Sequence, residues 1–359
     1  MEVGLTLNLK NQDGSLRLSL LEYGCYVQNI DIKLEGGASW LYQGLIDAFD
    51  DKITSAIEDA VSNNLRDLVM KLDSVLQSLP KEVAVTEIAD VNVTFVNEPV
   101  LTNTSLGLEV DGLFSLKGSD VLSEFRNLIP QASIPPKLAE KMVNIAVEEK
   151  VLESAALVYY EADKLHWIID EVPDTSLLNT AGWRFIVPRL YKDYPNDDMN
   201  LDVSLSSPPI IKILEQQIDV TVPSDVIIDV LHAGEVIQVA CLSMVVSASA
   251  SAEVSGDILY GSVKLRDFTM DLNWSKIGSL HMFLIQPVMS TVLRTVVVPY
   301  VNSKLGKGIV LPTFHGYKLE NAEIIYTDSW IVMSSDVASI EQYYTIKQPD
   351  QEVPSLQVA

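Results

Sequence analysis

Apolar and polar residues alternate along several stretches of the chain, and this two-residue period is typical of strands with one solvated face. The first stretch, MEVGLTLNLK (residues 1–10), leads into the turn sequence NQDG (11–14) and a second alternating stretch, so the pattern predicts a β-hairpin. A third alternating stretch, VQNIDIKL (27–34), predicts one more strand. Further strands are predicted after Pro80 and, in larger number, between residues 164 and 274.

Apolar residues at every third or fourth position between Ser39 and Pro80 predict one long amphipathic helix. Its first half carries the apolar stripe Leu41, Leu45, Phe49, Ile53 and Ile57. A helix of about 40 residues, at about 1.5 Å each, is about 60 Å long. Such a length suits a coiled coil or a helix lying along an elongated sheet, and the strands that precede it favour the sheet.

Two further helices are predicted in the second half of the chain. The first covers PKLAEKMVNIAVEEKVLESAALVYY, from Pro136 to Tyr160. The second covers residues 279–305, where apolar residues recur at helical spacing, although two prolines are expected to kink or interrupt it. One face of this second helix carries Leu284, Val288 and Val292.

The stretch SASASAEV (residues 247–254) alternates polar residues with very small apolar ones, which predicts a strand whose dry face offers little volume. That face presents Ala248, Ala250 and Ala252. If it faces the helix of residues 279–305, two arrangements fit. Either the alanines let strand and helix backbones approach closely, or they leave an unfilled apolar slot between them.

Residues 27–65 and 268–305 share one order of predicted elements: a strand, a turn, and a long helix that ends in an Asn-bearing step from Val to Leu. This weak repeat predicts two similar units. About 140 residues precede the long helix in the second unit, but only about 40 precede it in the first. We therefore expect about 100 residues of the first unit, and any signal peptide, to be absent from this chain.

Composition supports a large core and excludes several partners. Of the residues, 48% are hydrophobic, whereas the formal charge is -24 and the isoelectric point is near 4.4. Such acidity argues against nucleic-acid binding and against simple electrostatic docking on anionic membranes. No uninterrupted run of about 18 apolar residues predicts a membrane span.

The sequence carries no arrangement that predicts catalysis or a cofactor. Its four histidines lie outside any HExxH or Cys/His cluster, and no GxSxG, Walker or GxGxxG motif occurs. Neither a metal site nor catalytic residues are predicted. The two cysteines, Cys25 and Cys241, are either free thiols or one disulfide. If the protein is secreted, the sequons at Asn92, Asn103 and Asn273 are candidate glycosylation sites.

With this order of elements, the sequence resembles the bactericidal/permeability-increasing and lipopolysaccharide-binding protein family, including its plant members. The resemblance is clearest in residues 141–165 and 185–209, and it continues through SWLYQGL (39–45) and the long helix. It implies an α+β fold of two elongated antiparallel barrels, each wrapping a long helix and joined by a central sheet into a boomerang. The first barrel is expected to be incomplete here. A family disulfide to the long helix cannot form, because residues 39–80 contain no cysteine.

On this resemblance the chain divides into consecutive segments. They are a partial N-terminal barrel (1–79), central-sheet strands (80–115), a linker (116–135), a C-terminal barrel (136–316), further central-sheet strands (317–336) and a polar tail (337–359). The resemblance also implies apolar pockets for phospholipid acyl chains. We assign these pockets to the stripe of residues 41–57 and to the slot between the three alanines and the second helix.

The implied function is non-enzymatic binding of phospholipid or lipopolysaccharide by a secreted monomer with a role in innate defence and at most transient membrane contact. The chain itself shows no signal peptide. Two alternatives stay open: a lipid-transfer protein that shuttles lipid between membranes, and a shortened isoform that binds a protein partner through its open barrel.

Overall fold

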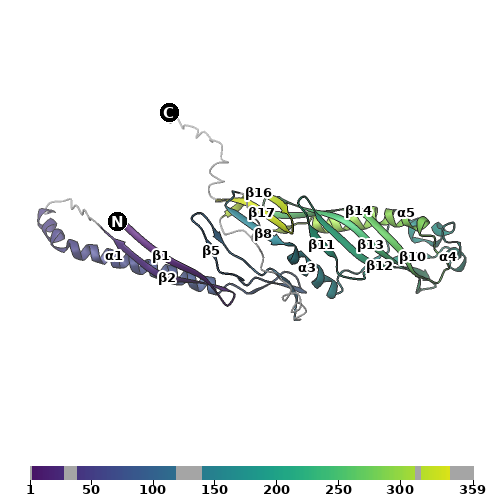
Figure 1. Cartoon of the computed structure of the whole chain (residues 1–359), viewed down its shortest axis with the longest axis horizontal. Coiled ribbons are helices and arrows are strands. Elements are labelled where there is room, and N and C mark those ends of the chain that lie inside the picture. Colours follow the sequence, from purple (N-terminus) through teal and green to yellow (C-terminus); the bar gives the residue numbers. More distant parts are fainter. Residues whose placement is uncertain (1, 28–38, 119–139, 312–316, 340–359) are drawn as a thin grey trace, which may run out of the picture. The chain divides into compact units, whose positions relative to one another are not determined.

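The computed structural model describes residues 2–27, 39–118, 140–311 and 317–339, which form two compact units, Met1–Lys117 and Gly118–Ala359 (Figure 1). Helices and antiparallel strands occur in separate stretches of both units, which confirms the predicted α+β class. The strand predicted at 27–34, most of the predicted linker at 116–135 and the tail after residue 339 lie outside the described residues.

The first unit begins with the predicted hairpin. Strands β1 (Glu2–Gln12) and β2 (Ser15–Tyr26) pair antiparallel around a two-residue turn. Both turn residues, Asp13 and Gly14, have positive φ, at 52° and 80°. This is the backbone twist that two-residue hairpins favour, and it explains the Asp-Gly sequence. The predicted long helix is also confirmed, as α1 (Ser39–Gln77), 39 residues long.

Acidic side chains of α1 hold the helix along the edge of β2 that pairs with no described strand. Asp73 accepts a hydrogen bond from the backbone N–H of Leu18 at 2.8 Å, and Glu58 accepts one from Val27 N–H at 2.8 Å. The carboxylates thus take the place of a neighbouring strand for two backbone donors. Burial raises the pKa of the Asp73 carboxyl, but hydrogen bonds from the side chain of Gln77 and from Leu18 N–H, together with the charge of Arg17, outweigh burial and hold this pKa below its usual value.

Short strands complete the first unit. Strands β3 (Glu82–Ala84), β4 (Ala89–Asn92) and β7 (Phe114–Leu116) form a three-stranded antiparallel sheet in that order, while β5 (Val100–Leu101) and β6 (Leu106–Gly107) form a small hairpin. The backbone N–H of Phe95 donates to the carbonyl of Gly14 at 3.0 Å, which ties this region to the β1–β2 turn.

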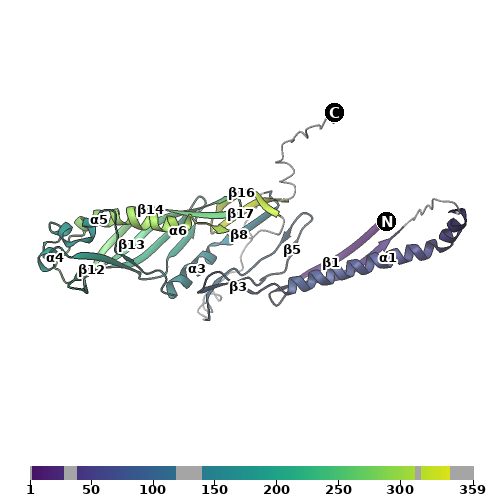
Figure 2. The same ribbon diagram turned by 180° about the vertical axis from the view of Figure 1, so that it is seen from behind.

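A seven-stranded antiparallel sheet dominates the second unit (Figures 1 and 2). Its main path runs β15-β14-β13-β12-β10-β9, and β11 also pairs with β12. The strands are β9 (Trp167–Ile169), β10 (Asp198–Leu205), β11 (Ile210–Ile213), β12 (Ile218–His232), β13 (Glu235–Ser255), β14 (Ile258–Ser275) and β15 (Ile309–Val310). The alternating stretch 247–254 lies, as predicted, within one strand, β13.

A second sheet corrects one prediction. Strands β16 (Tyr317–Thr327), β17 (Trp330–Ser339) and β8 (Val143–Glu148) pair antiparallel, and β8 leads directly into helix α3 (Glu149–Glu161). The helix predicted from Pro136 therefore begins only at Glu149 within the described residues. Residues 143–148 read VNIAVE, a two-residue alternation that fits the strand, and β17 supplies the pairing partner that fixes it.

A nearly continuous helix returns along the large sheet after β14. It comprises α5 (Met282–Val292), a π-helical turn η3 (Leu293–Val297) and α6 (Val298–Leu305). Two interruptions by proline were predicted, but the helix instead continues through both prolines and widens locally at η3. By length and composition alone, residues 282–305 would suffice to cross a membrane, which the absence of an uninterrupted apolar run did not predict. Ile285, Met289 and Val292 instead pack into the core of this unit.

The core lies where α5 meets the large sheet and a set of short helices. These are η1 (Thr175–Leu178), η2 (Thr180–Trp183) and α4 (Pro188–Asp193). The cluster joins Trp183 and Leu190 from the short helices to Leu242 of β13 and Ile285 of α5. Burying such large apolar side chains stabilises this end by roughly 1.5–3 kcal/mol for each one.

Helix α6 contacts strands near both ends of the sheet order. Its Asn302 bonds both backbone groups of Val263 in β14, and its Tyr300 stacks on Trp167 of β9 with ring centroids 4.4 Å apart. Because β14 and β9 lie at opposite sides of the sheet order, the sheet must curve around this helix.

Candidate functional site

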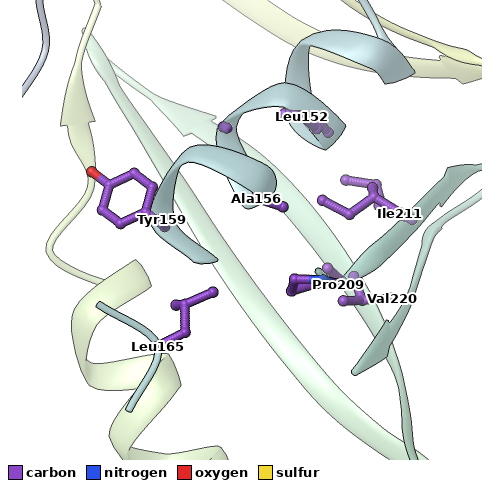
Figure 3. A pocket seen from close by; sticks show the side chains of 10 residues that line it. Leu152, Ala156, Tyr159, Leu165, Pro209, Ile211 and Val220 are labelled. Carbon is purple, nitrogen blue, oxygen red and sulfur yellow. The ribbon is translucent and has the colours of Figure 1, made fainter. Parts of the chain in front are cut away.

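An open apolar cleft of about 380 Å³ lies between α3 and the large sheet in the second unit (Figure 3). Helix α3 and the segment after it contribute Leu152, Ala155, Ala156, Tyr159 and Leu165, and the opposite side consists of Pro209, Ile211, Ile218, Val220 and Ala250. In Figure 3, Leu152 and Ala156 face Ile211, Pro209 and Val220 across the gap, whereas the Tyr159 hydroxyl points away from them. None of the described residues that line the cleft is charged.

The helical wall of the cleft follows from spacing. Leu152, Ala155, Ala156 and Tyr159 stand at positions i, i+3, i+4 and i+7, so they share one face of α3. Two of the four are alanines, which keeps this face thin. The other side of the helix is buried through Ser154 and Val158. The helix therefore packs by one side and leaves its small-residue face towards the sheet.

Strand register builds the floor. Ile211 of β11 lies opposite Val220 of β12, and Ile218 of β12 lies opposite Ala250 of β13. Directly opposed residues point to the same face, and so do residues two apart on one strand. Three β-branched side chains and one methyl group thus share a single apolar surface. The small Ala250 lowers this surface and makes room beneath α3.

A buried carboxylate fixes the distance between α3 and β11. Glu149, the first residue of α3, accepts a hydrogen bond from the backbone N–H of Ile213 at 2.7 Å and pairs with the ammonium of Lys212. The hydrogen bond to Glu149 is the main reason why the pKa of Lys212 is raised. Glu149 is nearly inaccessible to solvent, whereas Lys212 remains half exposed. The buried carboxylate is therefore the group that holds the start of α3 against β11.

The alanine strand and the predicted helix meet differently from expectation. Ala250 lines the cleft, but the wall across from it is α3; Leu284, Val288 and Val292 do not line it. Val292 is buried in the core cluster, Val288 packs against that cluster, and Leu284 is half-buried on α5. The predicted slot between these two sets of residues is thus not where the described cleft forms.

The direction of the returning helix explains the difference. After β14 the chain turns back, so α5 runs beside the end of that strand and α6 beside its start. Gly261 lies opposite Ala252, and a Cβ added to Gly261 would stand 3.4 Å from the Leu305 Cβ. Leu284 is about 18 residues before Asn302, or about 27 Å along the axis. Hence α6, not α5, lies beside the alanine stretch.

Ala248 and Ala252 flank the cleft rather than line it. Ala248 lies opposite Val220 of the floor and also borders a second, polar depression with Asp219 and Arg266. The backbone N–H of Ala252 donates to the hydroxyl of Tyr326 at 2.7 Å, and that hydroxyl donates to the Ala252 carbonyl at 3.2 Å. This small residue therefore lets a tyrosine from the neighbouring sheet reach the β13 backbone.

The candidate lining of the first unit is largely open. Phe49 and Ile57 on α1 are exposed and Ile53 is half-buried. Leu41 and Leu45 belong to the same helix, but their side chains lie outside the described part. Among the described residues, the two best-formed clefts are both lined by residues of the second unit, and neither is lined by residues of the first unit.

The three sequons differ in access. Asn103 is exposed at the tip of the β5–β6 hairpin. Asn273 is exposed on β14, beside a register shift, whereas Asn92 is buried and its side-chain oxygen accepts hydrogen bonds from the backbone and hydroxyl of Thr94. Asn103 and Asn273 are therefore accessible to an attached glycan, whereas the buried side chain of Asn92 is not.

In the part of the chain that the structure describes, titratable groups do not assemble into a reaction centre. Within the described residues, no group of three His, Cys, Asp or Glu side chains is placed to hold a metal ion. His166 and His232 are exposed, and each bonds one half-buried aspartate, Asp202 and Asp197 respectively, at 2.6 Å. Both cysteines are free, and burial raises the pKa of the Cys241 thiol, which favours its uncharged form.

The α3 side of the cleft was missed by sequence reasoning. The region was correctly predicted to contain a helix, but its face of Leu152, Ala155, Ala156 and Tyr159 was not singled out. The available signal was a helical face with two alanines, the same feature that drew attention to β13. Only pairing that face with Ile211, Ile218 and Val220 identifies a cleft, and that pairing is tertiary.

Comparison with known proteins gives a consistent result over most of the chain. The model of the LBP / BPI / CETP family, C-terminal domain, matches residues 83–339. A BPI/LBP family protein of Arabidopsis thaliana is 51% identical over 343 residues, covering 95% of this chain and 70% of the relative. The bactericidal permeability-increasing protein of Sebastes schlegelii is 27% identical, covering 94% of this chain and 72% of the relative.

More distant similarities agree. The phospholipid transfer protein of Mus musculus is 23% identical, over 94% of this chain and 69% of its own. A crystal structure of lipopolysaccharide binding protein superposes with a TM-score of 0.56 at 20% identity, covering 94% of this chain and 74% of that one, which supports the fold. Two of these proteins are named for transfer of phospholipid or binding of lipopolysaccharide, and none of them is named for catalysis, which agrees with the prediction of a non-enzymatic protein.

Proposed function

The chain belongs to the LBP / BPI / CETP family, and we propose that it binds a lipid by holding acyl chain in the cleft between α3 and the large sheet. The observation that carries this proposal is the lining: ten residues without a charge, arranged around an open volume of about 380 Å³. Ligand pockets of proteins span about 300–1,000 Å³. The volume suits part of one acyl chain better than a whole lipid.

The energetics need no charged anchor. Each methylene moved from water into an apolar site contributes about 0.8 kcal/mol, so six methylenes contribute about 5 kcal/mol. Such a gain is offset in part by the lost freedom of the lipid and by the water that the open side of the cleft admits. An acyl chain is therefore the class of ligand that this lining favours, while a sugar or phosphate would lose hydrogen bonds on entering it.

The finer architecture belongs to the same proposal. The contacts of α6 with both β14 and β9 support an elongated barrel in which a sheet wraps one helix. The two-barrel boomerang, a secreted monomer and the use of lipopolysaccharide rather than phospholipid in defence remain predictions. Their support is membership of a family whose relatives are named for lipopolysaccharide binding and for phospholipid transfer.

Two adjacent residues of β13 give a matched test. Ala250 points into the cleft, and Ser251, on the opposite face of the strand, is exposed. Replacing Ala250→Phe fills the cleft, whereas Ser251→Phe adds the same ring outside it. Lipid is extracted from each purified protein, then identified and quantified by mass spectrometry. In a second assay, each protein is titrated with a fluorescent phospholipid and its uptake is measured.

The expected result is at least a fivefold loss of bound lipid for Ala250→Phe, with Ser251→Phe equal to the wild type. Ala156→Phe, on the opposite wall, should reproduce the loss. Circular dichroism checks that each variant is folded. Equal lipid content in Ala250→Phe, Ala156→Phe and the wild type would place the ligand elsewhere and refute the proposal.

Lipid transfer is the second candidate, because phospholipid transfer proteins are among the relatives and the cleft is open on one side. The same cleft then serves as a carrier site. Movement of a labelled phospholipid from donor to acceptor vesicles separates a carrier from a static binder. A carrier accelerates this movement in proportion to its concentration, and Ala250→Phe abolishes the acceleration.

A further inference from the structure

A polar depression of about 340 Å³ lies on the large sheet of the second unit. It is lined by two carboxylates, two hydroxyls, one guanidinium and two apolar residues: Asp219, Thr221, Ser247, Arg266, Asp267, Val220 and Ala248. Its volume falls within the range of about 300–1,000 Å³ that ligand pockets span. Binding of an acyl chain in the apolar cleft uses none of these polar groups, so their role is separate.

Strand register gathers the polar groups on the face of the sheet opposite to the cleft. Thr221 of β12 lies opposite Ser247 of β13, which in turn lies opposite Asp267 of β14. Thr221 follows Val220 of the cleft floor, and successive residues of a strand point to opposite faces. Directly opposed side chains have Cβ atoms about 4.5–5.5 Å apart. The three side chains therefore form a row across three strands, close enough to contact one ligand.

A β-bulge brings a guanidinium to this row. Ser247 pairs with Asp267, whereas the next residue of β13, Ala248, pairs with Leu265, so Arg266 has no residue opposite it. Bulges re-aim a side chain and are over-represented next to functional sites. Here the extra residue is the one that contributes the positive charge of the depression.

Hydrogen bonds fix the guanidinium and leave several acceptors free. Nη1 of Arg266 donates to Oδ1 of Asp219 at 2.6 Å, and the side-chain amide of Gln217 donates to the same oxygen at 2.8 Å. Oδ1 of Asp267 accepts from the backbone N–H that follows it at 2.8 Å. Within the described part of the chain, no hydrogen bond reaches the second oxygen of either carboxylate or the two hydroxyls of the row. These oxygens remain for a ligand.

The charges around the depression disfavour a charged ligand. Two carboxylates against one guanidinium leave one net negative charge in the lining, and the whole chain carries -24. On the same face, Lys264 lies one row away, while Asp225 and Asp271 lie two rows away in the other direction. A phosphate or carboxylate is therefore repelled. A metal ion or an amine, in turn, would lie beside the guanidinium of Arg266.

We propose that the polar depression binds an uncharged sugar ring, the terminal hexose of a glycan or of a glycolipid headgroup. Hydroxyls of the ring donate to the free oxygens of Asp219 and Asp267 and accept from the guanidinium of Arg266, and hydrogen bonds to ionised groups are the stronger ones. A hydroxylated ring satisfies donors and acceptors together without adding a charge. This inference goes beyond acyl-chain binding and does not depend on it, because Ala250 of the cleft points to the other face of the sheet.

Saturation-transfer NMR with the full chain tests the proposal. The probes are the methyl glycosides of glucose, mannose and galactose, each at about 10 mM, which nearly saturates a site with a Kd of about 1 mM. Asp267→Asn removes a carboxylate of the depression, and Ser247→Phe fills it. Asp271→Asn is the matched control, because it removes an exposed carboxylate from the same face of β14 outside the depression. The thermal midpoint of each variant verifies folding.

The wild type and Asp271→Asn are expected to bind at least one methyl glycoside equally well. Asp267→Asn should raise its Kd at least fivefold, and Ser247→Phe should abolish the transfer. The 6-phosphate and the 2-amino derivative of the same hexose should bind more weakly than the neutral glycoside. Transfer to none of the three glycosides, equal binding by Asp267→Asn and the wild type, or tighter binding of either charged derivative would overturn the proposal.

Two further arms complete the test. A glycolipid that bears the bound hexose, in phosphatidylcholine vesicles, displaces the glycoside if the ligand is a headgroup, whereas only the free oligosaccharide displaces it if the ligand is a soluble glycan. Ala250→Phe should keep sugar binding, and Asp267→Asn should keep its extractable lipid. Failure of the sugar site is thereby distinguished from failure of the acyl-chain cleft.

Discussion

Replacing Asn302 with alanine tests how the returning helix is held against the large sheet. The side-chain oxygen of Asn302 accepts a hydrogen bond from the N–H of Val263 at 2.7 Å, and its amide nitrogen donates to the carbonyl of Val263 at 3.0 Å. Both bonds are partly buried. Val263 lies opposite Ala250 of β13 on one side, and on its other side no described strand pairs with it, so one amide satisfies both backbone groups at this edge of β14.

The magnitude follows from these two bonds. Each contributes about 1 kcal/mol net, so losing both costs about 2 kcal/mol. Because alanine is a better helix former than asparagine, the substitution recovers about 0.5 kcal/mol of the free energy of unfolding. The net loss in the free energy of unfolding is about 1.5 kcal/mol, which lowers the thermal midpoint of a domain of this size by about 3–6 °C.

Denaturant unfolding followed by circular dichroism measures the change. Asn302→Asp keeps the acceptor for Val263 N–H but sets an oxygen against the carbonyl, so it should destabilise at least as much as alanine. Ser303→Ala is the control, since Ser303 is exposed and its hydroxyl bonds only the carbonyl of Tyr300 in its own helix. If Asn302→Ala stays within about 0.5 kcal/mol of the wild type, the argument that this amide replaces a strand partner is refuted.

Two other substitutions test buried carboxylates. Burial, helped by Asp202, raises the pKa of Asp229, so the folded state holds the proton more tightly and stability falls as pH rises above about 4 through the raised pKa. Asp229→Asn should therefore raise the thermal midpoint at neutral pH and leave it unchanged near pH 3.5. Glu149→Ala leaves the buried N–H of Ile213 unpaired and should cost about 2 kcal/mol in chemical denaturation, with loss of extractable lipid.

Each has its own check. A gain from Asp229→Asn that is the same at both pH values would mean that packing, not ionisation, is responsible. Lys212→Met keeps the bond between Glu149 and Ile213, so it should cost much less than Glu149→Ala. Equal effects of these two variants would show that the ion pair, rather than the backbone bond, holds α3 in place.

Local patterns were sufficient for the elements that depend on neighbours in sequence. The hairpin of β1 and β2 follows from alternation around Asp13 and Gly14, and α1 follows from its apolar stripe, because both signals lie within one or two turns of chain. Where local signals compete, prediction failed. Residues 143–148 can form either helix or strand, and only pairing with β17 decides for the strand.

The sequence by itself determined that this is an α+β protein with a helix near each end of a large set of antiparallel strands, that it is acidic, and that Ala250 lies on the dry face of a strand. Only the tertiary structure decided what covers that face. The chain reverses after β14, so Leu284 lies near the end of that strand and α6 lies near its start, beside the alanines. The hydrogen bond from Ile213 N–H to Glu149 holds α3 across the cleft from Ile211 and Val220. Strand and helix periods say which way a side chain points, but the partner it meets depends on chain direction and on contacts between residues far apart in sequence.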